Sequence, residues 1–459
     1  MKQWLEIMLA RIFNRIFRKR MTSGETHGLD LGRRIVDGET AAGKVTISNS
    51  RRSQHLAVLG KTGSGKSFLL RHLAQQDIQS GRGFVYFDLH GDATPFLVAT
   101  IAAREEASNE DLSGKLIVIE PSDPEFSVGL NPLEGSSNGN RFIQTAEFAE
   151  ILRLRWNLDS FGARTDELLR NALYVLAENG LTLLELSPLL AHGAFRAKCI
   201  KNLTNAEVKQ YFEVRYDQMS EPMRAVMREP VLNKLTAFTA DTHFRHIVGQ
   251  SRSTFSTREA MDRGYWIVLN LHKGRLGEQA TTLGSLFLTT IKNALFSRTS
   301  REVFTLYCDE IQNLIAFGGG LETILSEARK FGVAVICANQ FLDQYPQEMR
   351  AAILSVGTHA FFQLSASDAQ NIASALDGGR PLGELLKNLP RRHMVVKTGS
   401  ERWQEAVVPT VAEPKVDPAG LYDRSRARWA RKRAEIEDEI RTRQAAIGRS
   451  TSEVLDEWE

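Results

Sequence analysis

Short apolar runs that end in polar residues recur along two parts of the chain. Runs of this kind, apolar throughout rather than alternating, indicate strands of a parallel sheet that are buried on both faces. They cover residues 54–59, 83–92, 116–119, 265–271, 303–310 and 332–340, with weaker runs at 358–364 and 394–397. Helical segments separate the runs. We therefore predict a doubly wound α/β domain whose ligands bind at the carboxyl ends of its strands.

The stretch from residue 140 to residue 262 follows a different pattern. Apolar residues recur there at helical spacing, and β-branched runs are nearly absent. The periodic segments cover residues 142–156, 166–178, 206–216 and 221–238. We predict an all-α domain inserted into the α/β domain, which divides the latter into residues 54–139 and 263–410.

Both ends of the chain lie outside these two domains. Residues 1–21 combine apolar residues at helical spacing with Lys and Arg, which predicts an amphipathic basic helix. This helix either contacts an anionic membrane surface, docks a partner, or covers its own domain or a neighbouring subunit. Residues 22–53 are predicted to form a linker and a small β-ribbon. Residues 411–459 are predicted to form a linker and a charged helical tail. The basic half of the tail either contacts DNA or a partner or, as the pattern favours, is a solvated helix with i,i+4 ion pairs.

Composition narrows the class of protein only modestly. The 459 residues are 42% hydrophobic and 25% charged, as expected for two or three ordinary globular domains. The net charge is only +3, so any contact with nucleic acid must come from local patches. The three cysteines are isolated, which predicts a reduced, cytoplasmic protein without disulfides. No run of 18 or more uncharged apolar residues occurs, so we predict no transmembrane helix and at most a peripheral contact with the inner membrane face.

The first apolar run leads directly into a phosphate-binding loop. Residues 60–67 fit the pattern G-x-x-x-x-G-K-[ST] in full. The glycines let successive backbone N–H groups face one anion, and the helix that follows adds the positive end of its dipole. We expect Lys66 to reach the β- and γ-phosphates of ATP and Ser67 to hold Mg²⁺. The residues predicted to bind the nucleotide are Gly60, Lys61, Thr62, Gly63, Ser64, Gly65, Lys66, Ser67 and Phe68.

Polar residues at the ends of two later runs predict hydrolysis as well as binding. Asp309 and Glu310 end the run at 303–310. Asp309 is expected to contact Mg²⁺ through water or Ser67, and Glu310 to deprotonate or orient the attacking water. Gln340 ends the following run and is expected beside Glu310, where its amide binds the γ-phosphate or that water.

Cations near these runs are assigned from position alone. Arg329 and Lys330 end the helix before the run at 332–340. A cation there either satisfies the C-terminal helix dipole or reaches the nucleotide of a neighbouring subunit as an arginine finger. We favour the finger for Arg329. Lys273 and Arg275, which follow a strand end, and the loop at 317–320 are candidates for lining a DNA channel, although each is equally compatible with an ordinary turn.

These motifs resemble those of the HerA–FtsK superfamily of DNA-pumping ring ATPases, close to the type IV conjugative coupling proteins of the TraD/TraG-like group. The matching segments lie within residues 30–400 and comprise 54–67, 87–92, 130–133, 308–310, 328–332, 339–340, 356–358 and 367–369. The resemblance implies a RecA-like P-loop motor domain with an inserted all-α domain, ATP and Mg²⁺ as cofactors, and a hexameric ring with DNA in its central channel. It also implies that Arg329 acts in trans.

The chain departs from that group in two respects. Membrane-anchored coupling proteins begin with transmembrane helices, which are not predicted here. Some relatives carry an arginine where this chain has Gln54. Either Arg51 or Arg52 is expected to substitute for that arginine, or the phosphate contact is missing.

The function expected from these features is that of an ATP-hydrolysing hexameric DNA translocase in conjugative transfer, mobile-element processing or anti-phage defence. The alternative is a non-translocating, ATP-switched ring scaffold that assembles or regulates a partner nuclease or secretion protein. A relaxase is a further candidate partner. A monomeric nucleotide-binding regulator fits less well, because it leaves Arg329 without a role.

Overall fold

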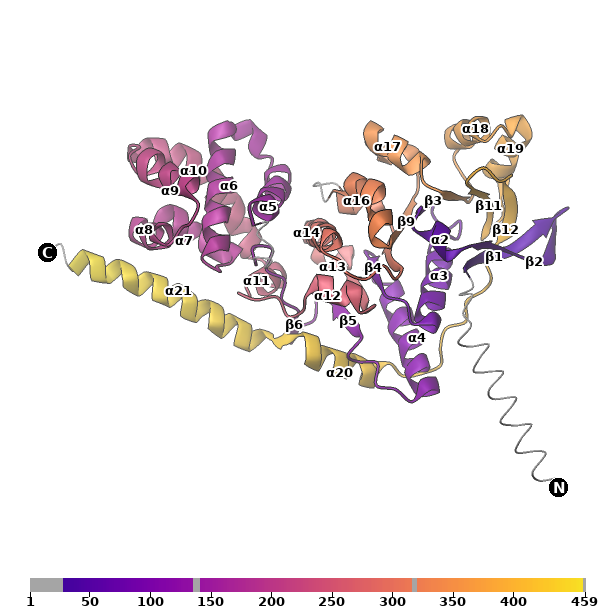
Figure 1. Cartoon of the computed structure of the whole chain (residues 1–459), viewed down its shortest axis with the longest axis horizontal. Helices are drawn as coiled ribbons and strands as arrows, with labels where there is room; N and C mark the ends of the chain where they lie inside the picture. Colours follow the sequence, from indigo (N-terminus) through magenta and orange to yellow (C-terminus); the bar gives the residue numbers. More distant parts are fainter. Residues whose placement is uncertain (1–27, 135–140, 316–319, 457–459) are drawn as a thin grey trace, which may run out of the picture.

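The computed structural model describes residues 28–134, 141–315 and 320–456. An α/β domain and a helical domain lie side by side, and the C-terminal helices run along both of them (Figure 1). The predicted basic helix at 1–21 lies outside the described residues. None of the helices in the described part of the chain combines the length and hydropathy that a membrane span requires.

In the described residues, eleven strands form one sheet in the order β2-β1-β12-β11-β10-β3-β9-β8-β4-β7-β5. The seven strands from β10 to β5 are parallel to one another, and the four at the other end pair antiparallel. The bounds are β1 Leu29–Val36, β2 Glu39–Ile47, β3 Leu56–Leu59, β4 Phe84–Asp88, β5 Leu116–Ile119, β7 Trp266–Asn270, β8 Phe304–Cys308, β9 Val333–Asn339, β10 Thr358–Phe361, β11 His393–Thr398 and β12 Gln404–Val407.

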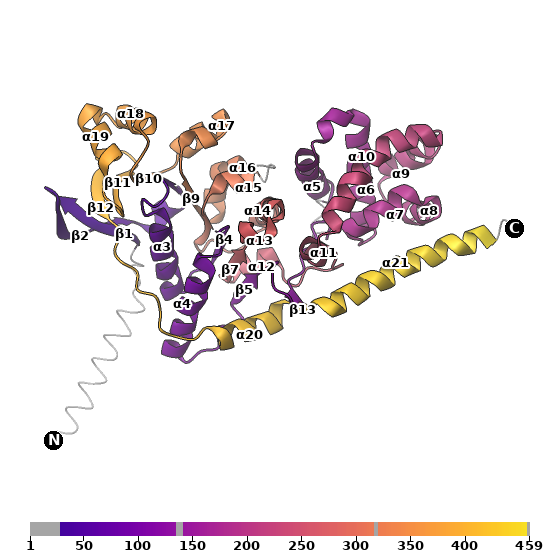
Figure 2. The ribbon, with the colours of Figure 1, turned by 180° about the vertical axis from the view of Figure 1, so that it is seen from behind.

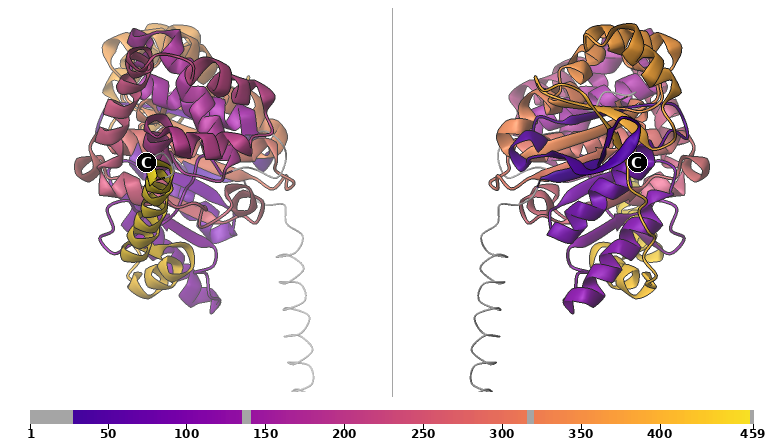
Figure 3. Two further views of the ribbon diagram at one scale, coloured as in Figure 1. Left: turned by 90° about the vertical axis from the view of Figure 1, so that its left-hand side faces the viewer. Right: turned by 90° about the vertical axis from the view of Figure 1, so that its right-hand side faces the viewer.

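The parallel strands are buried on both faces, as their apolar runs predicted. Successive side chains of β3 alternate between two hydrophobic cores: Leu56 and Val58 face one, whereas Ala57 and Leu59 face the other. The first core contains apolar residues of α3 (Lys66–Ser80) and α4 (Ala93–Ser108). The second contains those of α14 (Glu278–Phe296). End-on views show helices on both faces of the sheet (Figure 3).

Shorter helices connect the remaining strands of the α/β domain. Their bounds are α2 Asn49–Arg52, α12 Thr257–Asp262, α13 Lys273–Leu276, α15 Ile311–Ile315, α16 Leu321–Glu327, η4 Ala328–Phe331, η5 Leu342–Gln344, α17 Gln347–Leu354, α18 Ala366–Ala375 and α19 Gly379–Asn388.

Residues 141–256 contain helices joined by turns and no strand. Their core is continuous with the second core of the sheet, because α5 packs against α14. The bounds are α5 Arg141–Trp156, η1 Leu158–Phe161, α6 Ala163–Glu178, η2 Leu183–Glu185, α7 Leu186–Ala191, α8 Gly193–Lys201, α9 Ala206–Gln210, η3 Tyr211–Tyr216, α10 Glu221–Thr239 and α11 Thr242–Val248. The short helices α7, α8 and α11 carry too few residues to show a clear period and were not predicted.

The predicted β-ribbon is the hairpin of β1 and β2, but it is not a separate element before the core. β1 pairs antiparallel with β12, a strand that the sequence pattern did not reveal, so the hairpin extends the main sheet. The weak runs at 358–364 and 394–397 correspond to β10 and β11, which pair antiparallel. A doubly wound parallel sheet thus ends in an antiparallel extension.

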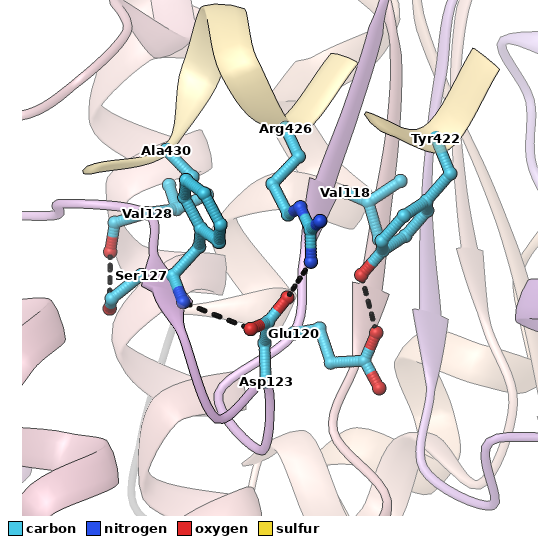
Figure 4. A pocket seen from close by; sticks show the side chains of 9 residues that line it. Val118, Glu120, Asp123, Ser127, Val128, Tyr422, Arg426 and Ala430 are labelled. Atoms are coloured by element: carbon cyan, nitrogen blue, oxygen red, sulfur yellow. Dashed lines mark hydrogen bonds and ion pairs between the residues drawn. The ribbon is translucent and has the colours of Figure 1, made fainter. Parts of the chain in front are cut away.

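The basic half of the tail is helical with arginines that are at least partly exposed, as predicted, but three of these arginines pair with acids of the α/β domain and not only with acids of the same helix. Helix α20 (Ala419–Trp429) covers β5. Arg424 pairs with Glu105, and Arg428 Nη2 lies 2.9 Å from Asp111 Oδ2. In Figure 4, Arg426 points at Asp123, and the Tyr422 hydroxyl donates to Glu120 Oε2 over 2.7 Å.

The tail then crosses to the helical domain (Figure 2). β13 (Arg431–Lys432) pairs with β6 (Phe126–Ser127), and α21 (Arg433–Asp456) continues along the helical domain. Ile436 and Ile440 are buried against Leu184, and Arg443 Nε lies 3.2 Å from the buried Glu185 Oε1. The tail therefore bridges the two domains of the chain.

Candidate active site

The phosphate loop connects the end of β3 to the start of α3, at the carboxyl edge of the parallel strands. Gly63 and Gly65 adopt φ values of +75° and +121°, which favour glycine. A Cβ atom on Gly65 would lie 2.9 Å from Arg392 Cα, so close approach also requires glycine there. A Cβ atom on Gly63 would meet nothing within 4 Å, so the loop is open on that side. This concave turn at the start of a 15-residue helix suits a bound phosphate.

Lys66 lies inside this loop. Its Nζ atom donates to the backbone oxygens of Gly60, at 2.6 Å, and Lys61, at 3.1 Å. Burial lowers the pKa of Lys66, and the charges of Asp309 and Glu310 oppose that shift. The buried amine and the loop's N–H groups form a cationic cradle of the kind that the phosphates of a nucleotide require.

Ser67 and Asp309 come together as predicted from their positions. The Ser67 hydroxyl donates to Asp309 Oδ2 over 3.0 Å. Burial raises the pKa of Asp309, whereas the Ser67 hydrogen bond and the charge of Lys66 lower it. A hydroxyl and a carboxylate are hard oxygen donors, so the pair fits a divalent cation such as Mg²⁺ that is shared with phosphate oxygens. Ser67 and Asp309 are the residues that would hold it.

Three side chains surround the Glu310 carboxylate. Gln340 Nε2 donates to Oε1 over 3.0 Å, and His90 Nε2 lies 3.4 Å from the same oxygen. Asn313 Nδ2 donates to Oε2 over 3.2 Å. The His90 hydrogen bond is the main cause of a lowered pKa of Glu310, and burial opposes it. The geometry therefore favours an ionised carboxylate, which is the form that a general base needs.

Gln340 connects this carboxylate to the phosphate loop. Strand β9 lies between β3 and β8, so residues that follow the three strands meet at one edge. Thr62 Oγ1 donates to Gln340 Oε1 over 3.1 Å while the amide nitrogen of Gln340 binds Glu310. The structure thus places Gln340 between the loop and the acid pair.

Sequence reasoning did not assign a role to His90 or Asn313. His90 lies in a tight turn after β4 that Asp88 organises, because its carboxylate accepts from the N–H groups of Gly91, Ala93 and Thr94 at 2.9, 3.0 and 2.7 Å. The motif at 87–92 was the available signal for His90. Asn313 lies one helical turn after Glu310, but no motif marks it.

Two arginines from far along the chain also border the phosphate loop. The Arg392 N–H donates to Ser64 O over 2.7 Å, and the Arg391 guanidinium lies 5.4 Å from the ring centroid of Phe68. They belong to the loop between α19 and β11, which the antiparallel extension of the sheet brings beside the P-loop. No local pattern in the sequence indicated this proximity.

Arg329 lies away from these groups. It belongs to η4, which immediately precedes β9, and so lies at the amino edge of the sheet. With Gln54 and Gly357 it lines a cavity of about 360 Å³. Arg329 therefore lies at the edge of the sheet opposite the phosphate loop of the same chain.

The neighbouring His55 ring is buried. Its Nδ1 atom accepts a hydrogen bond from Val335 N–H, and its Nε2 atom contacts Leu325 O, each over 3.0 Å. Burial lowers the pKa of His55 to about 4, and the charge of Arg329 adds to this.

Of the two alternatives at Gln54, substitution by Arg51 or Arg52 finds no support in the contacts of these arginines, which leaves a missing phosphate contact. The buried Arg52 binds Asp77 in a bidentate pair, at 2.8 and 2.6 Å. Arg51 pairs with Glu401. Neither arginine lines the cavity beside Gln54. The physical reason is that a buried carboxylate, Asp77, needs the Arg52 cation for itself.

The fold and the site define a P-loop protein of RecA-like architecture with an inserted all-α domain. The sequence matches the family "Helicase HerA, central domain" over residues 30–273. Because this match covers more than half of the chain, the protein belongs to the HerA family. No curated protein matches the chain in sequence.

Solved structures with a similar fold include the bacterial conjugative coupling protein TrwB and the protein VirB4. The unbound coupling protein TrwBΔN70 aligns with a TM-score of 0.57 and 18% identity, covering 87% of this chain and 92% of that one. TrwB with an ATP analogue gives 0.56 and 18%, covering 86% and 98%. VirB4 of Thermoanaerobacter pseudethanolicus gives 0.55 and 16%, covering 86% and 99%. At these identities the likeness concerns the fold.

Proposed function

We propose that this HerA-family protein hydrolyses ATP with Mg²⁺. The observation that carries the proposal is the connected set of Thr62, Gln340 and Glu310 beside the Ser67–Asp309 pair. A protein that only binds nucleotide needs the loop but not a carboxylate held ionised next to it. TrwB, which shares the fold, has been solved with an ATP analogue and with ADP and Mg²⁺, which supports these ligands.

Each residue has a defined part in this proposal. Lys66 and the loop N–H groups bind the phosphates, and Ser67 and Asp309 would hold the metal ion, which would neutralise charge on the transferred phosphoryl group. Glu310 accepts a proton from the attacking water, and Gln340 orients that water. Arg329, at the opposite edge of the sheet, serves the nucleotide of an adjacent subunit, so the complete site forms between subunits.

We further propose that the protein forms a hexameric ring and moves DNA through its central channel, as a coupling-protein-like or HerA-like translocase. Conjugative transfer, mobile-element processing and anti-phage defence are the processes that need such a motor. A relaxase, a nuclease or a secretion protein would be its partner, and residues 1–20 are the candidate contact with a membrane.

Phosphate release tests the enzymatic part of this proposal. Lys66→Ala should abolish nucleotide binding and hydrolysis, whereas Glu310→Gln should keep binding and lower kcat by about 10²–10⁴-fold. Turnover should rise with duplex DNA and with protein concentration, because the complete site needs two subunits. Hydrolysis that is independent of both would contradict a ring motor.

Displacement of a third strand from a DNA triplex tests translocation separately. The wild-type protein with ATP should displace it, and Glu310→Gln should not. DNA-stimulated hydrolysis without displacement would instead support the alternative, an ATP-switched scaffold that assembles a partner nuclease or secretion protein.

A further inference from the structure

A chain of side-chain hydrogen bonds leads from Glu310 to the protein surface. Asn313 Nδ2 donates to Glu310 Oε2 over 3.2 Å, and Lys273 Nζ donates to Asn313 Oδ1 over 3.1 Å. A lysine only donates and an ionised glutamate only accepts, so the Asn313 amide has one orientation that satisfies both partners. The two contacts are therefore linked through a single amide.

The two ends of this chain belong to different elements. Asn313 lies on α15, directly after Glu310, and its N–H donates to Glu310 O over 3.0 Å. Lys273 begins α13, after β7, and β4 separates β7 from β8 in the sheet. Through the Lys273–Asn313 contact, helix α13 therefore touches the residue that binds the Glu310 carboxylate.

Glu310 itself has a backbone conformation that is unusual for a residue with a side chain. Its φ value is +53°, in the left-handed region. Such conformations are energetically unfavourable and persist only where neighbouring contacts hold them. Asn313, which binds both the backbone oxygen and the carboxylate of Glu310, is one of those contacts.

The outer end of the chain is suited to an anion. Lys273 and Arg275 are both exposed on α13. Within residues 28–134, 141–315 and 320–456, neither forms an ion pair with a carboxylate, and the Nζ atom of Lys273 binds a neutral amide oxygen instead. A phosphate group competes well for such an ammonium group, because a charge-assisted hydrogen bond is about twice as strong as a neutral one.

We propose that Asn313 is a positioning residue that couples a nucleic-acid phosphate at Lys273 to the Glu310 carboxylate. The inference rests on the proposed ATPase function. When a phosphate takes Lys273, Asn313 Oδ1 loses its donor and the amide is no longer held against Oε2. That oxygen then accepts a hydrogen bond from water, so bound nucleic acid accelerates hydrolysis.

The test compares variants of the full chain by kcat with and without a saturating 40-base-pair DNA duplex. The wild-type protein should be stimulated several-fold. Asn313→Ala should show a raised basal kcat and a ratio of stimulated to basal rate close to one. Lys273→Ala should also have a ratio close to one, and the double variant should resemble either single variant, because both break the same link. Asn313→Leu, which is similar in size but has neither donor nor acceptor, serves if Asn313→Ala does not fold.

Arg275→Ala is the matched control, because it removes an exposed cation from the same helix without touching Asn313. It should weaken duplex binding, measured by fluorescence anisotropy, but keep the stimulation ratio at saturation. An unchanged ratio in Asn313→Ala, or equal effects of Lys273→Ala and Arg275→Ala, would overturn the coupling while leaving the ATPase proposal intact. Equal stimulation by heparin would overturn nucleic acid as the ligand. Absence of hydrolysis in the wild-type protein would overturn the proposed function itself.

Discussion

Arg329 and Lys66 lie at opposite edges of the same parallel sheet. Lys66 follows β3 at the carboxyl edge, whereas Arg329 precedes β9 at the amino edge, and the two strands are parallel neighbours that pair from Leu56–Ile336 to Leu59–Asn339. Within one chain, the phosphate-binding Lys66 and the candidate finger Arg329 are therefore separated by the length of the strands. A head-to-tail arrangement of subunits would bring one to the other, as a closed ring requires.

The position of Arg329 predicts complementation between inactive variants. Arg329→Ala should lower kcat by about 10³-fold or more while leaving nucleotide binding at its own loop intact. Glu310→Gln is inactive for a different reason. Mixed in equal amounts, the two should regain measurable phosphate release, because some interfaces then combine an intact Glu310 with an intact Arg329.

Lys330→Ala is the control for this experiment, since Lys330 is adjacent but exposed and pairs with Glu327. It should behave like the wild-type protein. No recovery in mixtures, under conditions in which both variants co-assemble, would indicate that Arg329 only satisfies the end of its own helix.

The amide of Gln340 should matter for the chemical step more than for binding. Gln340→Ala removes the bridge between Thr62 and Glu310 and should lower kcat by about 10²-fold, since loss of one preorganised donor has this order of effect. The KM for ATP should change little. Steady-state phosphate release measures both. Gln404→Ala, on β12, provides a comparison, and a selective rise in KM would assign Gln340 to binding instead.

The His90–Glu310 pair predicts the acid limb of the pH profile. The His90 hydrogen bond lowers the pKa of Glu310, and the same bond raises the pKa of His90. The charged pair is therefore intact between the lowered value of Glu310 and the raised value of His90. Activity should fall only as the pH drops through the pKa of Glu310, which lies below the ordinary value of a glutamate. In His90→Gln that pKa rises, so the loss should begin at higher pH.

The profile of kcat against pH, at saturating ATP, measures this shift. Protein stability must be checked at each pH by circular dichroism, so that acid unfolding is not mistaken for titration. An acid limb at the same pH in both proteins would show that His90 does not set the ionisation of Glu310.

The buried pair of Arg52 and Asp77 should stabilise the fold and not the chemistry. Tyr307 and Thr305 complete its hydrogen bonds, at 2.8 Å to Asp77 and 2.7 Å to Arg52. Arg52→Ala leaves a buried carboxylate without a partner and should cost about 3–5 kcal/mol of unfolding free energy. Arg51→Ala, at an exposed pair, should have a small effect. Urea unfolding measures both, and equal losses would contradict this assignment.

Much of the sheet was predictable because its signals are local. Apolar runs such as 83–92 and 332–340 marked β4 and β9, since a strand buried on both faces needs no polar alternation. The antiparallel extension was not predictable as such. β12 holds only four residues, Gln404–Val407, and its pairing with β1 joins segments from opposite ends of the chain.

The ion-pair partners of the tail were also not predictable from the sequence. Arg424 and Arg428 resemble, in sequence, the cations of an exposed helix with i,i+4 pairs. Their partners, Glu105 and Asp111, lie more than 300 residues earlier, at separations of 319 and 317. A charge pattern along one helix cannot reveal which acids another element will present to it.

The sequence by itself determined the phosphate loop, the paired acids Asp309 and Glu310, and the order of strands and helices that carries them. These features are visible in the sequence because each depends only on residues close together in the chain, within one turn or one strand. Only the tertiary structure decided what surrounds Glu310. The Thr62–Gln340 contact spans 278 residues, and the order β3-β9-β8 that creates it is set by packing of the whole sheet. Contacts over such distances depend on the two hydrophobic cores, because these fix the order in which the strands lie side by side.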